Sequence, residues 1–367
     1  MNTVFNIIKI VVVIIGTIIG AGFASGKEIY IFFAQYEEIG IIGAIIASIL
    51  AAIIIYSTIL IVKKYKIQNN NEFVENISNN NEITQILKNI INIFLVISFW
   101  IMSTGFCTFF KQEMGIPLIV TAVINSIITY ILLLKKVDGV IKLNLIVVPI
   151  MILIIMFVSI KNYQVTSLLE AKLNIVSTSD AITSIKELSK VIINAILYIS
   201  YNSITLITII ISLGSKITNK KENKYISIVS GCIIGILILA IYKMLTSCSI
   251  NVSNLELPIL RILDECHPIE KSIYSIAIIT AILTSAISSG YGVLENIENK
   301  EKYKKIAFII CILEIPIAYI GFGRLISALY PTFGIIGIIE IISILKKANS
   351  IAKDDENWYK LYREIER

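Results

Sequence analysis

Long apolar stretches alternate with short polar ones along almost the whole chain. A helix needs roughly 20 apolar residues to cross the hydrocarbon core of a bilayer. Ten stretches approach or exceed that length, at approximately residues 7–34, 39–62, 90–110, 117–134, 140–160, 188–213, 225–247, 272–294, 306–321 and 325–345. The pattern predicts an all-α integral membrane protein with ten transmembrane helices.

Composition agrees with this prediction, since 56% of the 367 residues are hydrophobic and only 16% are charged. With the N-terminus inside the cell, most of the 32 Lys and Arg residues fall in cytoplasmic segments. The positive-inside rule therefore favours a plasma-membrane protein with both termini cytoplasmic. A cleaved signal peptide is the alternative for the first stretch, but its removal would leave an odd number of spans.

The net charge of +6 then reflects the membrane topology and does not indicate a nucleic-acid partner. We expect the chain to lie in the lipid bilayer. Ten spans allow a division into two inverted repeats of five, as in many transporters. A short sequence similarity between the two repeats supports this division weakly, because span 3 holds "STGF" (103–106) where span 8 holds "SSGY" (288–291). The expected units are a first repeat, an outer loop, a second repeat and a cytoplasmic tail, at residues 1–160, 161–187, 188–345 and 346–367.

The first span contains the unusual stretch "GTIIGAGFASGKE", residues 16–28. Its glycines recur at GxxxG spacings, which also suit close packing between membrane helices. However, each glycine costs about 1 kcal/mol relative to alanine in a helix, and an adjacent Lys27 and Glu28 follow at membrane depth. The stretch therefore predicts a local unwinding. The polar run "YISYNS" (198–203) predicts a second break in span 6.

Broken helices expose amide and carbonyl groups that suit a zwitterionic solute together with Na⁺. At these residues the chain resembles the amino acid, polyamine and organocation transporter superfamily with the LeuT-type fold. The first span is similar to that of the YkvI-type branch of bacterial membrane proteins. The resemblance implies a five-plus-five inverted repeat in which helices 1 and 6 are broken.

The resemblance also implies a Na⁺ site. The family pattern places its ligands at the carbonyls of Gly16, Ile19 and Ala281 and at the hydroxyls of Thr284 and Ser285. The alternative for the two hydroxyls is a hydrogen bond back to a carbonyl in the preceding helical turn. Proton-driven relatives carry a lysine in span 5, whereas residues 145–158 are apolar here, which favours Na⁺.

The same resemblance implies the solute site. It places the solute carboxylate at the amides of helix 1 and the amine at helix 6, with aromatic residues closing over the side chain. The implied residues are Ala21, Gly22 and Phe23, then Tyr198, Ile199, Ser200, Tyr201 and Asn202, and finally Phe106.

Charged residues inside spans are functional candidates because burying a charge in lipid costs a few kcal/mol. Glu28 and Glu314 are the deepest, and we expect Glu28 to pair with Arg324 near the outer gate. Glu340 lies nearer a span end, where a long side chain is expected to snorkel to the interface.

These features predict a secondary active transporter of a small amino acid or related solute, coupled to Na⁺ and working by alternating access. The alternative is a transporter-like nutrient receptor that binds its solute without net transport. No nucleophile–base pair, metal cluster or phosphate loop is apparent, so we expect neither an enzyme nor a cofactor. Cys248 and Cys266 both fall near the outer face, and the sequence leaves their pairing open.

Overall fold

The computed structural model describes residues 2–78, 81–135, 139–161, 178–214, 217, 220–247, 251–266, 268–294, 297 and 299–365. All regular structure in these residues is helical. The elements are α1 (Asn2–Ile18), α2 (Ala21–Ser25), α3 (Lys27–Phe32), the 3-10 helix η1 (Ala34–Ile39), α4 (Gly40–Tyr65), α5 (Asn70–Ile77), α6 (Asn81–Met114), α7 (Leu118–Lys135), α8 (Gly139–Lys161), α9 (Thr178–Leu213), α10 (Lys220–Ser247), α11 (Pro258–Cys266), α12 (Pro268–Leu294), α13 (Lys300–Ala318) and α14 (Phe322–Ile365). Each predicted span lies mainly in helix.

Six helices of the described chain are long and apolar enough to cross a membrane, and they lie in α4, α6, α9, α10, α12 and α14. Shorter apolar helices lie in α1, α7 and α8. Large apolar side chains such as Ile49, Ile127 and Ile276 are more than half exposed on the molecular surface. An apolar outer surface on apolar helices suits contact with lipid, and the chain is an all-helical membrane protein.

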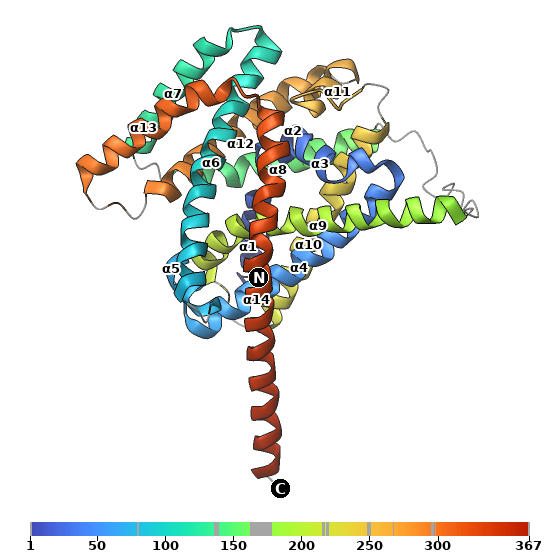
Figure 1. Ribbon diagram of the computed structural model, residues 1–367, viewed down its shortest axis with the longest axis vertical. Coiled ribbons are helices and arrows are strands. Elements are labelled where there is room, and N and C mark those ends of the chain that lie inside the picture. The colour runs from blue at the N-terminus through green and yellow to red at the C-terminus, as the bar shows by residue number, and fades with distance from the viewer. Residues whose placement is uncertain are drawn as a thin grey trace.

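The helices form one bundle in which α9 packs against α4 and α14, while α12 packs against α6 and α8. The short helix α11 lies at one end of the bundle, beside α2 and α12 (Figure 1). The short helix α5 lies toward the other end, and the C-terminal half of α14 projects beyond the bundle in that direction (Figure 1). We call these the α11 end and the α5 end.

The first span is broken, as the sequence predicts. α1 stops at Ile18, and the Gly20 amide donates to the Ile18 carbonyl over 2.8 Å. In an unbroken helix that amide would bind the Gly16 carbonyl. A second interruption follows at Gly26, whose φ of 81° lies in the left-handed region that glycine tolerates best. Gly16 also serves packing, since a Cβ there would lie 3.2 Å from Val148 Cγ2.

The predicted break in span 6 is wrong, because α9 runs as one helix through residues 198–203. Its polar side chains hydrogen-bond to carbonyls of their own helix. Ser200 Oγ donates to Ile196 O over 2.7 Å, and Asn202 Nδ2 donates to Tyr198 O over 2.9 Å. Polar groups satisfied in this way need no unwinding of the backbone.

Two of the expected unit boundaries fall inside continuous helices. α9 already begins at Thr178, and α14 continues past residue 346 without interruption. Most of the expected outer loop, at 162–177, lies outside the described residues, as do Cys248 and the Cys266 side chain.

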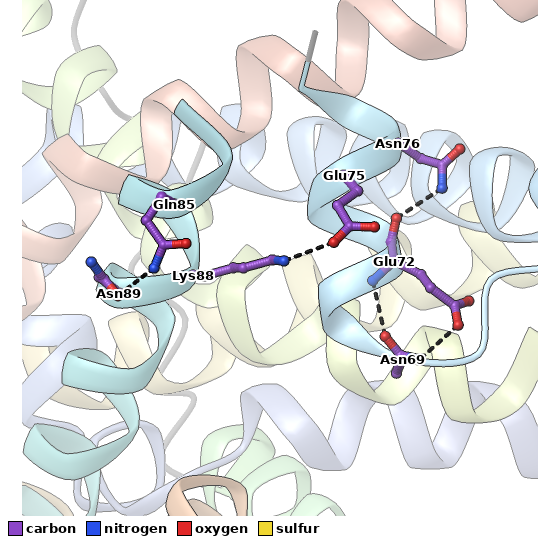
Figure 2. Close-up of polar contacts among 7 residues, drawn as sticks. All are labelled: Asn69, Glu72, Glu75, Asn76, Gln85, Lys88 and Asn89. Atoms are coloured by element: carbon purple, nitrogen blue, oxygen red, sulfur yellow. Dashed lines mark hydrogen bonds and ion pairs between the residues drawn. The ribbon is translucent and has the colours of Figure 1, made fainter. Parts of the chain in front are cut away.

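α5 is held near the N-terminal end of α6 by local polar contacts (Figure 2). Asn69 caps α5, because its Oδ1 accepts the Glu72 amide over 2.9 Å while its Nδ2 donates to Glu72 Oε1 over 2.7 Å. Lys88 of α6 then reaches Glu75 of α5, with 2.8 Å between Nζ and Oε1. These contacts fix α5 under the bundle, beside the site described next.

Candidate functional site

A cavity of about 190 Å³ lies beside the break in the first span. Its walls come from α1, α6, α9 and α12, and Tyr330 of α14 adds to them. That volume is enough for several water molecules or for a small organic solute. The cavity therefore suits a solute with few heavy atoms.

The lining combines hydroxyl groups with a few apolar side chains. Phe94, Leu95 and Met102 of α6 supply apolar surface. The hydroxyl-bearing residues are Thr17, Ser98, Tyr201, Thr205, Thr208, Ser285, Ser288, Ser289 and Tyr330. Among the described lining residues Glu28 is the one acid, and no Lys, Arg or His lines the cavity.

Glu28 is held in place by α2 and α9. Its side chain is 3% exposed, and the Tyr201 hydroxyl donates to its Oε1. Asn202 and Tyr198 lie beside the same carboxylate. A Cβ on Gly22 would come within 2.6 Å of Oε2, so the missing side chain at Gly22 makes room for this carboxylate. The Glu28 carboxyl group thus lies against Gly22 of α2, where the sequence placed the solute carboxylate.

Aromatic rings surround this carboxylate. Tyr201 stacks on Tyr330 with ring centroids 4.5 Å apart, and Phe32 stacks on the same Tyr201 at 5.6 Å. Tyr198 meets Phe32 edge to face at 5.4 Å. The rings form a wall between the cavity and the α11 end, and close-packed side chains of this kind leave little room for a solute to pass.

The α11 end is closed above that wall. Ile259 of α11 packs on Gly26, where a Cβ would lie 2.8 Å from Ile259 Cγ1. The Tyr274 hydroxyl donates to the Ala24 carbonyl over 2.6 Å. Lys27 is buried at this end, and its Nζ donates to the Ser253 carbonyl over 2.7 Å.

Charged contacts hold α11 itself on the bundle. Lys271 Nζ lies 2.7 Å from Glu113 Oε2 of α6 and 2.8 Å from Asp264 Oδ1 of α11. The hydrogen bond from Lys271 lowers the pKa of the Asp264 carboxyl from its usual value. The ion pairs tie α6, α11 and α12 together over the closed end.

The α5 end, in contrast, leads out of the cavity. A second hollow of about 360 Å³, lined by Gln68, Asn69 and Asn71 among others, adjoins the cavity there. The two hollows share the lining residues Asn70, Leu95, Thr208 and Gly292. Polar side chains therefore mark a route from the cavity to the α5 end.

Five of the residues singled out from the sequence line the cavity: Gly16, Glu28, Tyr201, Asn202 and Ser285. The others do not line it. Buried behind its walls or elsewhere in the bundle are Ile19, Ala21, Gly22, Phe23, Phe106, Tyr198, Ile199, Ser200, Ala281, Thr284 and Glu314.

Some of these placements have a simple physical reason. Phe106 turns away to stack with Phe110, at 4.7 Å between ring centroids, and so does not close over the cavity. The Thr284 hydroxyl donates back to the Ala281 carbonyl over 3.1 Å, which is the alternative bonding expected for this residue. The same bond places two of the expected ion ligands next to each other.

Two expectations about charges are wrong. Glu28 faces Tyr201 and Gly22, whereas Arg324 is exposed, so the two do not pair. Glu340 does not snorkel, because it is 2% exposed and accepts a 3.3 Å hydrogen bond from Ser203 Oγ. In both cases a hydroxyl group of α9, from Tyr201 or Ser203, hydrogen-bonds to the buried carboxyl group.

Glu314 lies between α7 and α13, where Asn125 Nδ2 donates to its Oε1 over 2.9 Å. It is 1% exposed. This buried carboxyl is therefore held within the bundle and does not reach the cavity lining.

The sequence did not single out several lining residues, notably Ser98, Met102, Thr205 and Tyr330. Their spacing along one face of α6 or α9 becomes visible only when the helices are packed. Ser288 and Ser289 had a signal, since they form part of the "SSGY" stretch in span 8.

Sequence comparison finds two relatives in Bacillus subtilis (strain 168). The chain is 23% identical over 338 residues to the uncharacterized membrane protein YkvI, covering 91% of this chain and 94% of that protein. It is 24% identical over 355 residues to the uncharacterized protein YyaD, covering 92% and 95%. No family model matches the chain.

Comparison of structures shows the fold. A variant of the Eremococcus coleocola manganese transporter matches with a TM-score of 0.59 at 14% identity, covering 92% of this chain and 77% of that one. A Na⁺-coupled sialic acid symporter in a substrate-bound, outward-open state matches with a TM-score of 0.50 at 16% identity, covering 91% and 76%. The chain therefore has a transporter-like fold that matches LeuT-fold proteins, and these structural neighbours are transporters rather than enzymes.

Proposed function

We propose that this chain is a secondary active transporter of a small amino acid or a related solute, coupled to Na⁺ and working by alternating access. One observation carries the proposal. A small cavity, closed toward the α11 end and continuous with a polar hollow toward the α5 end, lies at the break of the first span. Secondary transporters bind their solutes near the membrane midplane at broken helices of this kind.

The proposed topology has ten spans arranged as two inverted repeats of five, with both termini cytoplasmic in the plasma membrane. The distribution of Lys and Arg supports this orientation, because the segment holding α5 and the C-terminal part of the chain from residue 346 are both rich in Lys and Arg. In this orientation the α5 end faces the cytoplasm. The cavity then belongs to an inward-facing state.

In the proposed cycle the solute lies between α1, α6, α9 and α12, against Tyr201 and Asn202. The aromatic wall at Tyr201 and Tyr330 separates it from the outside. Rocking of one group of helices against the other would close the polar hollow at α5 and open the wall, which is the alternating-access scheme.

The proposed Na⁺ site uses the carbonyls of Gly16, Ile19 and Ala281 with the hydroxyls of Thr284 and Ser285. The broken helix supports it, because the Gly20 amide donates to Ile18 and leaves the Gly16 carbonyl without its usual helical donor. Gly16 and Ser285 also line the same cavity. Neutral oxygen ligands suit a hard monovalent cation.

A binding screen followed by uptake tests the function. The purified chain is heated with each member of an amino-acid and amine panel, in NaCl and in choline chloride, because a ligand of the folded state raises its apparent stability. The best hit is then offered to proteoliposomes under an inward Na⁺ gradient. The proposal predicts concentrative uptake, whereas saturable binding without uptake would indicate the receptor alternative.

A double variant tests the ion site. Thr284→Ala combined with Ser285→Ala should abolish the stimulation by Na⁺. The matched control is Thr280→Ala on the same helix, because the exposed Thr280 hydroxyl only donates to Ile276 O, over 2.8 Å. Unchanged Na⁺ dependence in the double variant would refute the assignment.

A further inference from the structure

Glu28 brings the one carboxyl group to a cavity whose described lining holds no Lys, Arg or His. The remaining described lining residues are apolar, hydroxyl-bearing or amide side chains. A carboxylate removed from water is costly unless a cation or several donors compensate it. The charge of this group therefore dominates what the cavity can accept.

The neighbouring basic residue does not supply that compensation. Lys27 has other partners, since its Nζ donates to Ser253 O and lies near Glu256. Its ammonium group also lies 5.6 Å from the Tyr30 ring centroid. Lys27 is thus engaged at the closed α11 end, away from the cavity.

The contacts of Glu28 fix where its carboxyl group lies. The Tyr201 hydroxyl donates to one oxygen, and Gly22 leaves space for the other. These neighbours fix the carboxyl group beside the cavity, and a cation placed next to it would favour its charged form. A solute carboxylate would find no Lys, Arg or His among the described lining residues to compensate its charge, which disfavours its binding.

The surrounding rings favour an organic cation over a metal ion. Tyr201, Tyr330 and Phe94 all line the cavity, and aromatic faces attract ammonium groups within about 6 Å. A divalent metal prefers several carboxylate or imidazole ligands. The described residues contain no group of three His, Cys, Asp or Glu side chains that could hold a metal ion.

We infer that the cavity selects small amines and other organic monocations, whose ammonium group pairs with Glu28, and that it does not need a carboxylate on the solute. The inference rests on the proposed function, and it names the solute class of the same site. Glu28 is the residue that determines this specificity, and the hydroxyls of α12 face the neutral part of the solute.

Four solutes on one three-carbon skeleton test this inference by thermal shift of the full chain at fixed NaCl. Alaninol carries an amine, alanine an amine and a carboxylate, lactate a carboxylate, and 1,2-propanediol neither. The expected order of affinity is alaninol, alanine, propanediol and then lactate. We expect about a tenfold step between alaninol and propanediol, as for one charge-assisted hydrogen bond.

Glu28→Gln should remove the preference for alaninol over propanediol. The matched control is Glu340→Gln, which neutralises a carboxyl that is equally buried but does not line the cavity, and it should keep the preference. A MnCl₂ arm with each protein detects a metal site instead.

The inference is overturned if alanine shifts the protein and alaninol does not, if Glu28→Gln leaves the preference intact, or if Mn²⁺ stabilises more than alaninol. Silence with all four solutes also contradicts it. These outcomes leave the proposed transport function standing whenever another organic solute is taken up by proteoliposomes. Absence of uptake for every solute that binds would instead reject the transport function.

Discussion

The first span and α9 carry similar interruptions in their apolar sequences but adopt different backbones. Between Ile18 and Lys27 the chain leaves the helix twice, at Gly20 and at Gly26. α9 passes through "YISYNS" as one continuous helix. The two segments lie on either side of Glu28, and both contribute to the cavity.

The difference lies in how each segment satisfies its polar groups. Serine and asparagine carry their own hydrogen-bonding atoms, which in α9 bond to carbonyls three or four residues earlier. Glycine has no such atoms, but it permits backbone angles closed to other residues. A polar interruption in a membrane helix therefore predicts a break when it is rich in glycine, and a side-chain surface when it is rich in hydroxyls.

Substitution of Gly26 should have the largest effect on this comparison. Gly26→Ala meets both a positive φ and Ile259 at 2.8 Å, and we expect a loss of roughly 2–4 kcal/mol from these two causes together. Thermal unfolding in detergent measures it. Gly115→Ala is the control, because Gly115 has a φ of 67° but nothing within 4 Å, so its loss should be nearer 1 kcal/mol. Equal losses would show that packing of α11 on the break contributes nothing.

A smaller loss is expected at Gly22, which has helical backbone but touches Glu28. Gly22→Ala should displace the Glu28 carboxylate at a cost of about 1–3 kcal/mol, as overpacking does in cores. Adding Glu28→Ala removes the clash, so the double variant should lose less than the two single losses combined. Additive losses would mean that the side chain does not occupy this position.

Tyr201→Phe removes the hydroxyl that α9 offers to Glu28 while keeping the stacked ring. Leaving a buried acceptor without its donor costs about 1–3 kcal/mol, and we expect a stability loss near the middle of that range because two helices lose their polar contact. Tyr274→Phe is the comparison, since its hydroxyl donates to the neutral Ala24 carbonyl and should contribute about 1 kcal/mol. A larger loss at Tyr274 would contradict the stronger contribution assigned to the hydrogen bond between Tyr201 and Glu28.

Ser200→Ala should have the smallest effect. Its hydroxyl bonds within α9 to Ile196 O, and such bonds add little to helix stability. We expect a change within about 0.5 kcal/mol in the thermal unfolding experiment. A loss well above 1 kcal/mol would indicate that the hydroxyl replaces a broken backbone contact after all.

Much of the fold could be predicted from the sequence, because lipid imposes strict periodicity and length on a spanning helix. All ten apolar stretches lie mainly in helix, and the glycine-rich run marks the break. The continuity of α9 was not predictable from composition, since the choice between unwinding and back-bonding depends on local geometry at Ser200 and Asn202.

The candidate site was only partly predictable. Gly16, Tyr201, Asn202 and Ser285 line the cavity as expected of site residues. The role of Glu28 depends on which way α3 faces after Gly26, and so the sequence assigned it the wrong partner. Residues such as Thr205 and Met102 carry no motif and are recognised only from the packed helices.

The most direct test of the central claim is the accessibility of the cavity from each side of the membrane. In a variant with Cys107, Cys232, Cys248, Cys266 and Cys311 replaced by Ala, Ser288→Cys provides one thiol in the exposed part of the lining. Its reaction with a membrane-impermeant thiol reagent is measured in right-side-out and inside-out vesicles.

The account predicts labelling from the cytoplasmic side, slowed by a bound solute, because the cavity opens at the α5 end and is closed by the aromatic wall at the other. Labelling from the outside alone, or labelling that no solute slows, would contradict a solute cavity in an inward-facing transporter.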